Sequence, residues 1–232
     1  MAPNPHSRPV ILYRWLVFAL AAFYSVYMLT TSSYEGAGGP FRYLTIWALL
    51  LSFFCASRVL AISERRSDRR WDAVIAATAV VNAMVVFLYW RLYFADAASV
   101  TRNGELGVWW KEYYLHGAGA VLMWIDAIVI NRPFRRLVAS ALTLVGIVVA
   151  YVAWSELLVG PLNGTPIGSV TTGLPYPFLN NLELAGRLEF YGVNVVTALV
   201  VLAVFFALGW VMRRVFGDRP DIAAGTDKAV RA

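Results

Sequence analysis

Six long apolar segments, each bounded by charged residues, proline or glycine, limit most strictly what this chain can fold into. They lie at about residues 10–29, 43–61, 73–94, 108–130, 134–159 and 188–212. An α-helix rises about 1.5 Å per residue, so it needs about 20 residues to cross the roughly 30 Å of hydrocarbon in a bilayer. Each segment is about that long. The sequence therefore predicts an all-α, polytopic membrane protein with six transmembrane helices.

The composition excludes the main alternatives. Apolar residues make up 59% of the chain and charged residues 15%, whereas a soluble domain carries about 25% charged residues. The single cysteine, Cys55, excludes an intrachain disulfide and a cysteine-built metal site. The only two histidines, His6 and His116, disfavour a histidine-rich metal cluster and a bis-histidine haem. We therefore expect one membrane domain over residues 1–232, with no metal and no cofactor.

Basic residues concentrate in alternate loops. The segment 63–71 holds four arginines, the turn 131–136 holds three, and Arg213, Arg214 and Arg219 follow the last span. The other three connecting segments together are nearly neutral. Since cytoplasmic loops carry an excess of lysine and arginine, both termini are expected in the cytoplasm. The net charge of +6 is then a signal of membrane topology, and we expect no nucleic-acid partner. The first span is expected to be retained, because tyrosines and a methionine stand where a signal peptide would need small residues.

One face of the fourth span is unusually polar. Residues three or four positions apart share a side of a helix, which groups Glu112, His116, Gly119, Ala120, Met123 and Asp126. Ionisable groups in a span are costly in lipid, so they normally face the interior of the bundle and often mark a site. This face is therefore predicted to line a cavity. The comparable face of the second span, with Ser52 and Cys55, is interpreted as helix packing.

Thr45 and His116 are predicted to lie at similar depths. Thr45 is about one turn inside the second span, and His116 lies roughly 10 Å beyond the residues that open the fourth span, both from the outer side. A threonine hydroxyl becomes a nucleophile when a base takes its proton, and a buried neutral imidazole suits that task. From spacing alone, a histidine that only makes packing contacts remains an alternative.

Other polar residues of the spans are candidates for orienting His116 or binding a substrate head group. They are Asn82, Tyr89, Glu112, Glu156, Glu189, Tyr191 and Asn194. The longest loop, residues 160–187, is rich in proline and glycine but also contains aromatic residues. Loops of that length are often functional, and this one is predicted to form a lid at the outer membrane surface.

Three short motifs carry a family resemblance. Residues 39–47, GPFRYLTIW, resemble the K/R-F/Y-L-T-x-W/L segment of the androgen-induced gene 1 and FAR-17a family. Residues 114–117, YLHG, look like the second signature of that family, and residues 176–179, YPFL, are similar to its aromatic-proline segment. The resemblance covers most of the chain in the number and order of helices. The motifs are short, so their specificity comes from occurring together in corresponding spans.

The resemblance implies a function. Characterised animal members of the family are threonine hydrolases of the membrane interior that cleave fatty-acid esters of hydroxy fatty acids. Carried over to this sequence, the catalytic pair is Thr45 as nucleophile and His116 as general base. We therefore expect an intramembrane hydrolase of lipid carboxylic esters, which takes its substrate from the surrounding membrane lipids. The basic, alanine-rich cytoplasmic side and short tail suggest a bacterial member, located in the inner membrane.

A non-enzymatic protein that binds or transports a lipid or small molecule in the same cavity is the competing hypothesis. It would keep the inward polar faces but would need no contact between a histidine and a hydroxyl. Thr45 and His116 on opposite sides of the bundle would favour this alternative.

Overall fold

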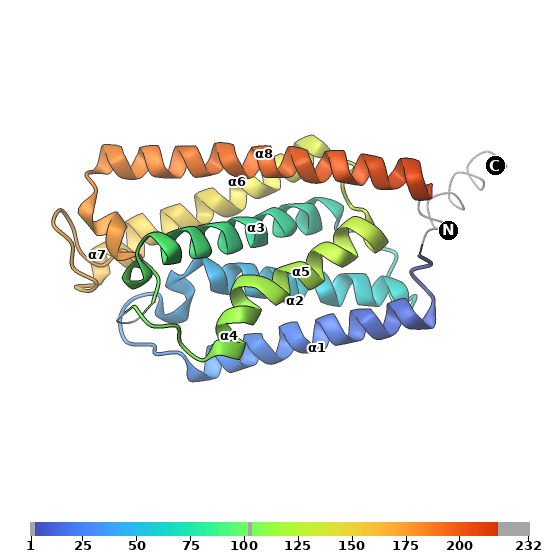
Figure 1. Ribbon diagram of the computed structural model, residues 1–232, viewed down its shortest axis with the longest axis horizontal. Helices are drawn as coiled ribbons and strands as arrows, with labels where there is room; N and C mark the ends of the chain where they lie inside the picture. The colour runs from blue at the N-terminus through green and yellow to red at the C-terminus, as the bar shows by residue number, and fades with distance from the viewer. Residues whose placement is uncertain (1–2, 102–103, 218–232) are drawn as a thin grey trace.

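The computed structural model describes residues 3–101 and 104–217 and confirms the predicted fold class (Figure 1). It is about 76% helical. The described residues contain six helices long and apolar enough to cross a membrane: Arg8–Thr31, Leu44–Ser63, Asp72–Ala95, Trp109–Asn131, Leu137–Leu162 and Leu184–Phe216. Their ends differ by no more than about four residues from the expected ones, the usual uncertainty of helix ends read from sequence. Arg219 lies outside the described residues.

Four of the six spans are regular helices, and two contain π-helical segments. The regular spans are α1 (Arg8–Thr31), α2 (Leu44–Ser63), α3 (Asp72–Ala95) and α8 (Leu184–Phe216). The fourth span consists of α4 (Trp109–Tyr113), the π-helix η3 (Tyr114–Ala118), α5 (Gly119–Ile125) and the π-helix η4 (Asp126–Asn131). The fifth consists of α6 (Leu137–Trp154), the π-helix η5 (Ser155–Val159) and α7 (Gly160–Leu162). Short 3₁₀ helices lie at Gly39–Arg42 (η1), Ala97–Ser99 (η2) and Pro177–Asn181 (η6).

The start of α1 and the end of α8 lie at the same end of the bundle, as an even number of spans requires (Figure 1). We call this the terminal end. The opposite end, here called the loop end, carries residues 32–43, the turn after α3 and residues 163–183. Helix α8 begins at Leu184, four residues before the expected start. Its first turn is held by Arg187, whose Nε donates to Glu156 Oε1 at 3.0 Å.

Helix α3 is the centre of the bundle. It packs against α2, α5, α6 and α8, and 61% of its most apolar stretch is buried, against 17% in the fifth span and 22% in the sixth. Small side chains at Ala76, Ala77 and Ala79 are completely buried, and small residues let neighbouring helices approach closely. The outer helices α6 and α8 expose apolar side chains such as Leu142 and Val200, as helices in contact with lipid do.

A buried ion pair joins the first span to the fourth near the terminal end. Arg14 donates from Nε to Asp126 Oδ2 at 2.6 Å and from Nη2 to Oδ1 at 3.1 Å. Its Nη1 donates to the Val59 carbonyl at 2.9 Å and to Ser63 Oγ at 2.7 Å. Arg14 is 2% exposed and Asp126 6%. Every charged atom of the pair thus has a partner, which is the condition for keeping charge in lipid.

The loop between α7 and α8 folds around one buried asparagine. The Asn180 side chain donates to the carbonyls of Pro166 at 3.1 Å and Leu174 at 3.0 Å, and accepts from the Leu174 N–H at 3.1 Å. The backbone carbonyl of Asn180 accepts from the N–H groups of Val170 and Thr171, each at 3.0 Å. This asparagine, part of the short helix η6, therefore holds the rest of the loop in place through its hydrogen bonds.

Replacing Asn180 with alanine is expected to loosen this loop. The change leaves buried backbone groups without partners, at about 1–3 kcal/mol. We expect cleavage within residues 163–183 by an added protease to become about tenfold faster or more. Glu183, which is exposed and makes no capping hydrogen bond through its side chain, provides the control as Glu183→Ala. Equal cleavage rates for the two variants would contradict this role of Asn180.

Candidate active site

His116 lies where the fourth span departs from α-helical geometry. Its φ of −113° and ψ of 23° interrupt the helix inside the π-helix η3. The Trp90 indole of α3 donates to the His116 carbonyl at 2.7 Å and so satisfies it. Single-turn π-helical segments are frequent at functional sites. Here the segment places an imidazole in the bundle interior.

The His116 ring is held on one face and at one edge. It stacks on the Tyr89 ring of α3, with centroids 3.5 Å apart and planes 3° from parallel. Its Nε2 lies 3.5 Å from Glu112 Oε2. The ring is almost completely buried, and Nδ1 has no hydrogen-bond partner among residues 3–101 and 104–217. The imidazole therefore keeps Nδ1 free of hydrogen bonds in the interior of the helix bundle.

Glu112 is the polar centre of this cluster. Its Oε2 accepts from the Tyr89 hydroxyl at 3.1 Å, and its Oε1 lies 3.2 Å from Lys111 Nζ. A carboxylate beside Nε2 favours the tautomer with its proton on that nitrogen, which leaves the Nδ1 lone pair free to accept a proton. Of the predicted orienting residues, Tyr89 and Glu112 are the two that the structure brings to His116.

Thr45 lies in the first turn of α2, at the loop end. It is half-buried, and the chain before it is held by two hydrogen bonds. The Tyr151 hydroxyl of α6 donates to the Arg42 carbonyl at 3.0 Å, and Trp47 Nε1 donates to the Phe41 carbonyl at 2.9 Å. Helix α2 packs against η3, the segment that carries His116. In the described part of the chain, no hydrogen bond joins the Thr45 hydroxyl to the His116 ring.

The predicted lid also reaches the start of α2. The rings of Tyr176 and Tyr43 meet edge to face, with centroids 6.1 Å apart. Burial raises the pKa of the Tyr176 phenol above its ordinary value, with a smaller lowering from its contacts to Tyr151 and to the Leu44 backbone. The phenol is therefore neutral and keeps its proton for donation. The loop thus contacts the turn that leads to Thr45.

A model of the FAR-17a/AIG1-like protein family matches residues 10–210. This chain belongs to that family. Comparisons with curated proteins and with solved structures found no match. The motifs around Thr45 and His116 both lie inside the matched range. As a FAR-17a/AIG1-like protein, the chain therefore carries its two candidate catalytic residues within the family region.

The remaining predicted residues of this FAR-17a/AIG1-like protein lie away from the His116 ring. Glu156 accepts from the Tyr191 hydroxyl at 2.7 Å and, as described, from Arg187, so these three residues link η5 to α8. Asn194 donates to the Phe190 carbonyl of its own helix at 2.7 Å. Glu189 is exposed on α8.

Asn82 bridges two helices of the core. It donates to Ser52 Oγ at 2.9 Å and to the Thr78 carbonyl at 2.9 Å. Ser52 and Cys55 thus face α3, since the Cys55 sulfur lies 3.4 Å from Thr78 Oγ1. The polar face of α2 therefore makes packing contacts, as the sequence suggested. In the part of the chain that is described, no group of three or more His, Cys, Asp or Glu side chains is placed to hold a metal ion.

A small cavity of about 30 Å³ lies between α1, α2 and the fourth span. Its wall includes Ser52, Cys55, Tyr114 and Gly119, and also the Arg14–Asp126 pair. Neither Thr45 nor His116 lines it. About one or two water molecules would fill this volume.

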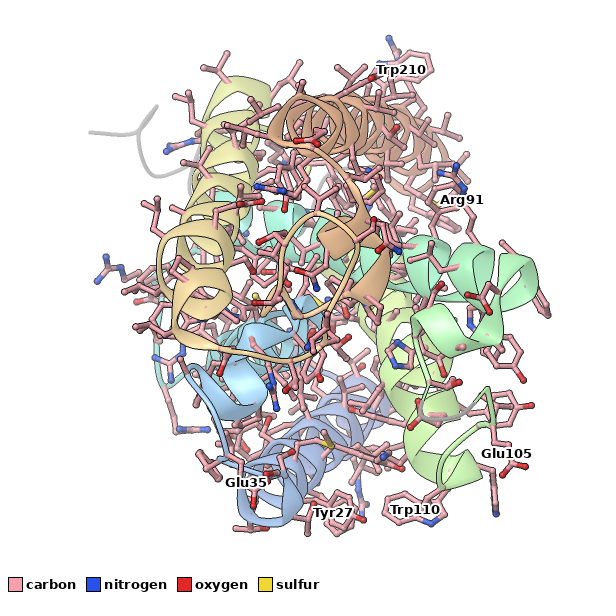
Figure 2. The ribbon with its side chains drawn as sticks, turned by 90° about the vertical axis from the view of Figure 1, so that its left-hand side faces the viewer. Tyr27, Glu35, Arg91, Glu105, Trp110 and Trp210 are labelled. Atoms are coloured by element: carbon pink, nitrogen blue, oxygen red, sulfur yellow. The ribbon has the colours of Figure 1, made fainter. Side chains whose placement is uncertain are left out.

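Aromatic residues surround the start of the fourth span at the loop end. Figure 2, viewed from that end, shows Trp110 beside Tyr27 at the edge of the bundle, with ring centroids 5.1 Å apart. Tyr24 stacks on Tyr114 at 3.6 Å. Such aromatic groups are typical of the membrane interface, and here they fasten the fourth span to α1.

Sequence reasoning missed three features of the site. The partner of Asp126 is Arg14, 112 positions away; an arginine inside the first span was the available signal. The bond from Trp90 to the His116 carbonyl depends on the π-helix, for which a single sequence gives no pattern. The environment of Arg42, described below, depends on a loop conformation.

Proposed function

We propose that this FAR-17a/AIG1-like protein is an intramembrane lipid ester hydrolase that uses Thr45 as nucleophile and His116 as general base. The observation that carries the proposal is the buried His116 ring, with Glu112 beside Nε2 and no partner at Nδ1. A base needs this combination of a fixed tautomer and a free lone pair. Fatty-acid esters of hydroxy fatty acids, reaching the site from the outer leaflet, are the proposed substrates.

In the first half-reaction, His116 Nδ1 takes the proton of the Thr45 hydroxyl while Oγ1 attacks the ester carbonyl carbon. The tetrahedral intermediate collapses by breaking the bond between that carbon and the alcohol oxygen. The alcohol leaves with the proton that His116 had taken, and an acyl-threonine remains. In the second half-reaction, His116 activates a water molecule, which releases the fatty acid and restores the Thr45 hydroxyl.

The position of Thr45 in α2 supports this assignment. The first N–H groups of a helix have no partner one turn back within the helix. In α2 the Ile46 N–H bonds to the Tyr43 carbonyl at 3.0 Å and the Leu44 backbone contacts Tyr176, so the donor that we propose next to the nucleophile is the N–H of Thr45 itself. Donors of this kind stabilise the oxyanion of a tetrahedral intermediate. The hydroxyl and the imidazole are not bonded to each other in this structure. Catalytic hydrogen bonds are often long in the absence of substrate and tighten when it binds.

The alternative is a protein that binds or transports a lipid without cleaving it. Such a protein needs no hydrogen bond between the Thr45 hydroxyl and the His116 ring, and the described residues contain none. The cavity lined by Tyr114 and Gly119 lies beside η3, includes neither Thr45 nor His116, and at about 30 Å³ holds water rather than a lipid chain. Turnover distinguishes the two functions. We expect purified protein in detergent to release fatty acid from an ester of palmitic acid with hydroxystearic acid, and binding without release would favour the alternative.

Glu112→Gln is expected to lower kcat about 10- to 100-fold and to leave KM nearly unchanged. The amide keeps the shape of the side chain but loses the negative charge that fixes the His116 tautomer. Glu112→Asp keeps the charge and should restore part of the rate. Initial-rate kinetics of the three proteins provide the measurement. A purely structural role predicts instead that Glu112→Asp is as slow as Glu112→Gln.

A further inference from the structure

An open pocket of about 580 Å³ lies at the loop end, beside the turn that leads to Thr45. Its wall consists of aromatic rings and glycine backbone: Tyr34, Gly36, Gly38, Gly39, Phe41, Trp47 and Trp154. Gly38 has φ +83°, and a Cβ atom there would lie 3.0 Å from Val159 and 3.4 Å from Trp154. The conformation and the close packing both require glycine. The three glycines thus contribute backbone to the wall and no side chain that would fill the pocket.

Within the described residues, one nitrogen donor in the wall of this pocket and one next to the wall have no hydrogen-bond partner. The Nε1 of Trp154, a wall residue, is buried without a hydrogen bond, and so is the Nε of Arg42. Arg42 borders the wall, since its Nη1 would lie 3.8 Å from a Cβ atom on Gly36. Unpaired donors in such places are uncommon in folded proteins. They indicate an acceptor that binds there.

Arg42 also lacks a counter-charge. Within residues 3–101 and 104–217, its guanidinium lies over the Tyr43 ring, 5.5 Å from the centroid, and makes no ion pair. Arg14 and Arg187, by contrast, are each paired with a carboxylate. A guanidinium binds a carboxylate through two parallel hydrogen bonds. Arg42 is therefore chemically suited to an oxyanion at the edge of the apolar pocket.

We propose that this pocket binds the free carboxylate of the lipid substrate, through Arg42, and so positions the ester at Thr45. The identity of the ligand rests on the proposed hydrolase function, whereas the site itself rests on the pocket and its unpaired donors. The aromatic wall contacts the alkyl segment next to the carboxylate. The substrate class is thus an ester that carries an acid group on the same molecule.

The reach of the chain fits this arrangement. Arg42 precedes Thr45 by three residues, so their Cα atoms are no more than about 11 Å apart. A carboxylate at Arg42 and an ester carbonyl at Thr45 would be joined by a short alkyl segment. A hydroxy fatty acid, esterified along its chain, has this geometry. A simple wax ester, without a charged end, would leave Arg42 unpaired.

Binding calorimetry tests the proposal without turnover. In the Thr45→Ala protein, in a neutral detergent, we expect hexadecanoate to bind about tenfold or more tightly than its methyl ester, because a hydrogen bond to a charged group is lost in the ester. Arg42→Gln in the same background should remove that difference, and Arg42→Lys should restore part of it. Arg58→Gln removes a cation from the other end of the same helix and should leave the preference for the acid intact.

Three results would overturn the inference: equal affinity for acid and ester, an Arg42→Gln protein that retains the preference, or displacement of the acid by phosphatidylglycerol at equal concentration. The last would assign the site to a phospholipid head group. The two proposals fail separately. Arg42-dependent acid binding in a protein that hydrolyses no ester keeps this inference and rejects the hydrolase, whereas hydrolysis with no Arg42-dependent preference does the reverse.

Discussion

Thr45→Ala is expected to lower ester hydrolysis at least about a thousandfold, because it removes the oxygen that forms the acyl-enzyme. Thr45→Ser keeps a hydroxyl at the same place, primary instead of secondary, and should retain measurable turnover. The measurement is initial-rate release of fatty acid, with protein amounts normalised by the monodisperse fraction in gel filtration. Because Thr45 is half-buried and makes no hydrogen bond through its side chain in the described residues, folding should be unchanged.

Ser52→Ala provides the matched control. Ser52 lies two turns further along α2, and its hydroxyl bonds to the Ala48 carbonyl at 2.7 Å and to Asn82. We assign it to helix packing, so turnover should stay close to that of the wild type. Loss of activity in both variants would indicate that α2 tolerates no substitution on this face. Retention of activity in Thr45→Ala would reject Thr45 as nucleophile.

Breaking the Arg14–Asp126 pair is expected to have the largest effect on stability. Arg14→Ala leaves the Asp126 carboxylate buried without its partner, a loss of about 3–5 kcal/mol. For a chain of this size we expect the melting temperature to fall by about 10 °C. Thermal unfolding in detergent, followed by gel filtration, is the measurement. Arg8→Ala, which removes an exposed arginine from the same helix, should leave the melting temperature unchanged.

A second variant separates the cost of an unpaired charge from the value of the pair. The double substitution Arg14→Met with Asp126→Leu replaces both charges with apolar groups of similar size. It should be more stable than either single variant, because no buried charge is left alone. A double variant as unstable as the sum of the single ones would mean that the two residues act independently, which would contradict the pairing.

The fold could be predicted from the sequence because its signal is local. Each span is a run of apolar residues of sufficient length, and bilayer thickness sets that length whatever the partners are. The start of α8 was missed by four residues, since it depends on the contact between Arg187 and Glu156 from another span. The three π-helices were missed for the same reason, because tertiary contacts such as the Trp90–His116 bond stabilise them.

The candidate site was predictable in its residues but not in their partners. Helical spacing placed Glu112 one turn from His116, and the structure keeps that pair at 3.5 Å. The same spacing placed Asp126 on that face, but its partner Arg14 lies in another span. Helical periodicity relates residues within one helix, whereas contacts between spans depend on how the helices are rotated and tilted against each other.

The most direct test of the central claim is to identify the residue that becomes acylated. The protein is mixed with excess lipid ester, quenched with acid within the first turnovers, digested and analysed by mass spectrometry. The account predicts an acyl mass on the peptide that contains Thr45, and no such mass in the Thr45→Ala protein. Hydrolysis at the wild-type rate with the acyl mass on another residue, or with no acyl-protein under any quench time, would contradict it.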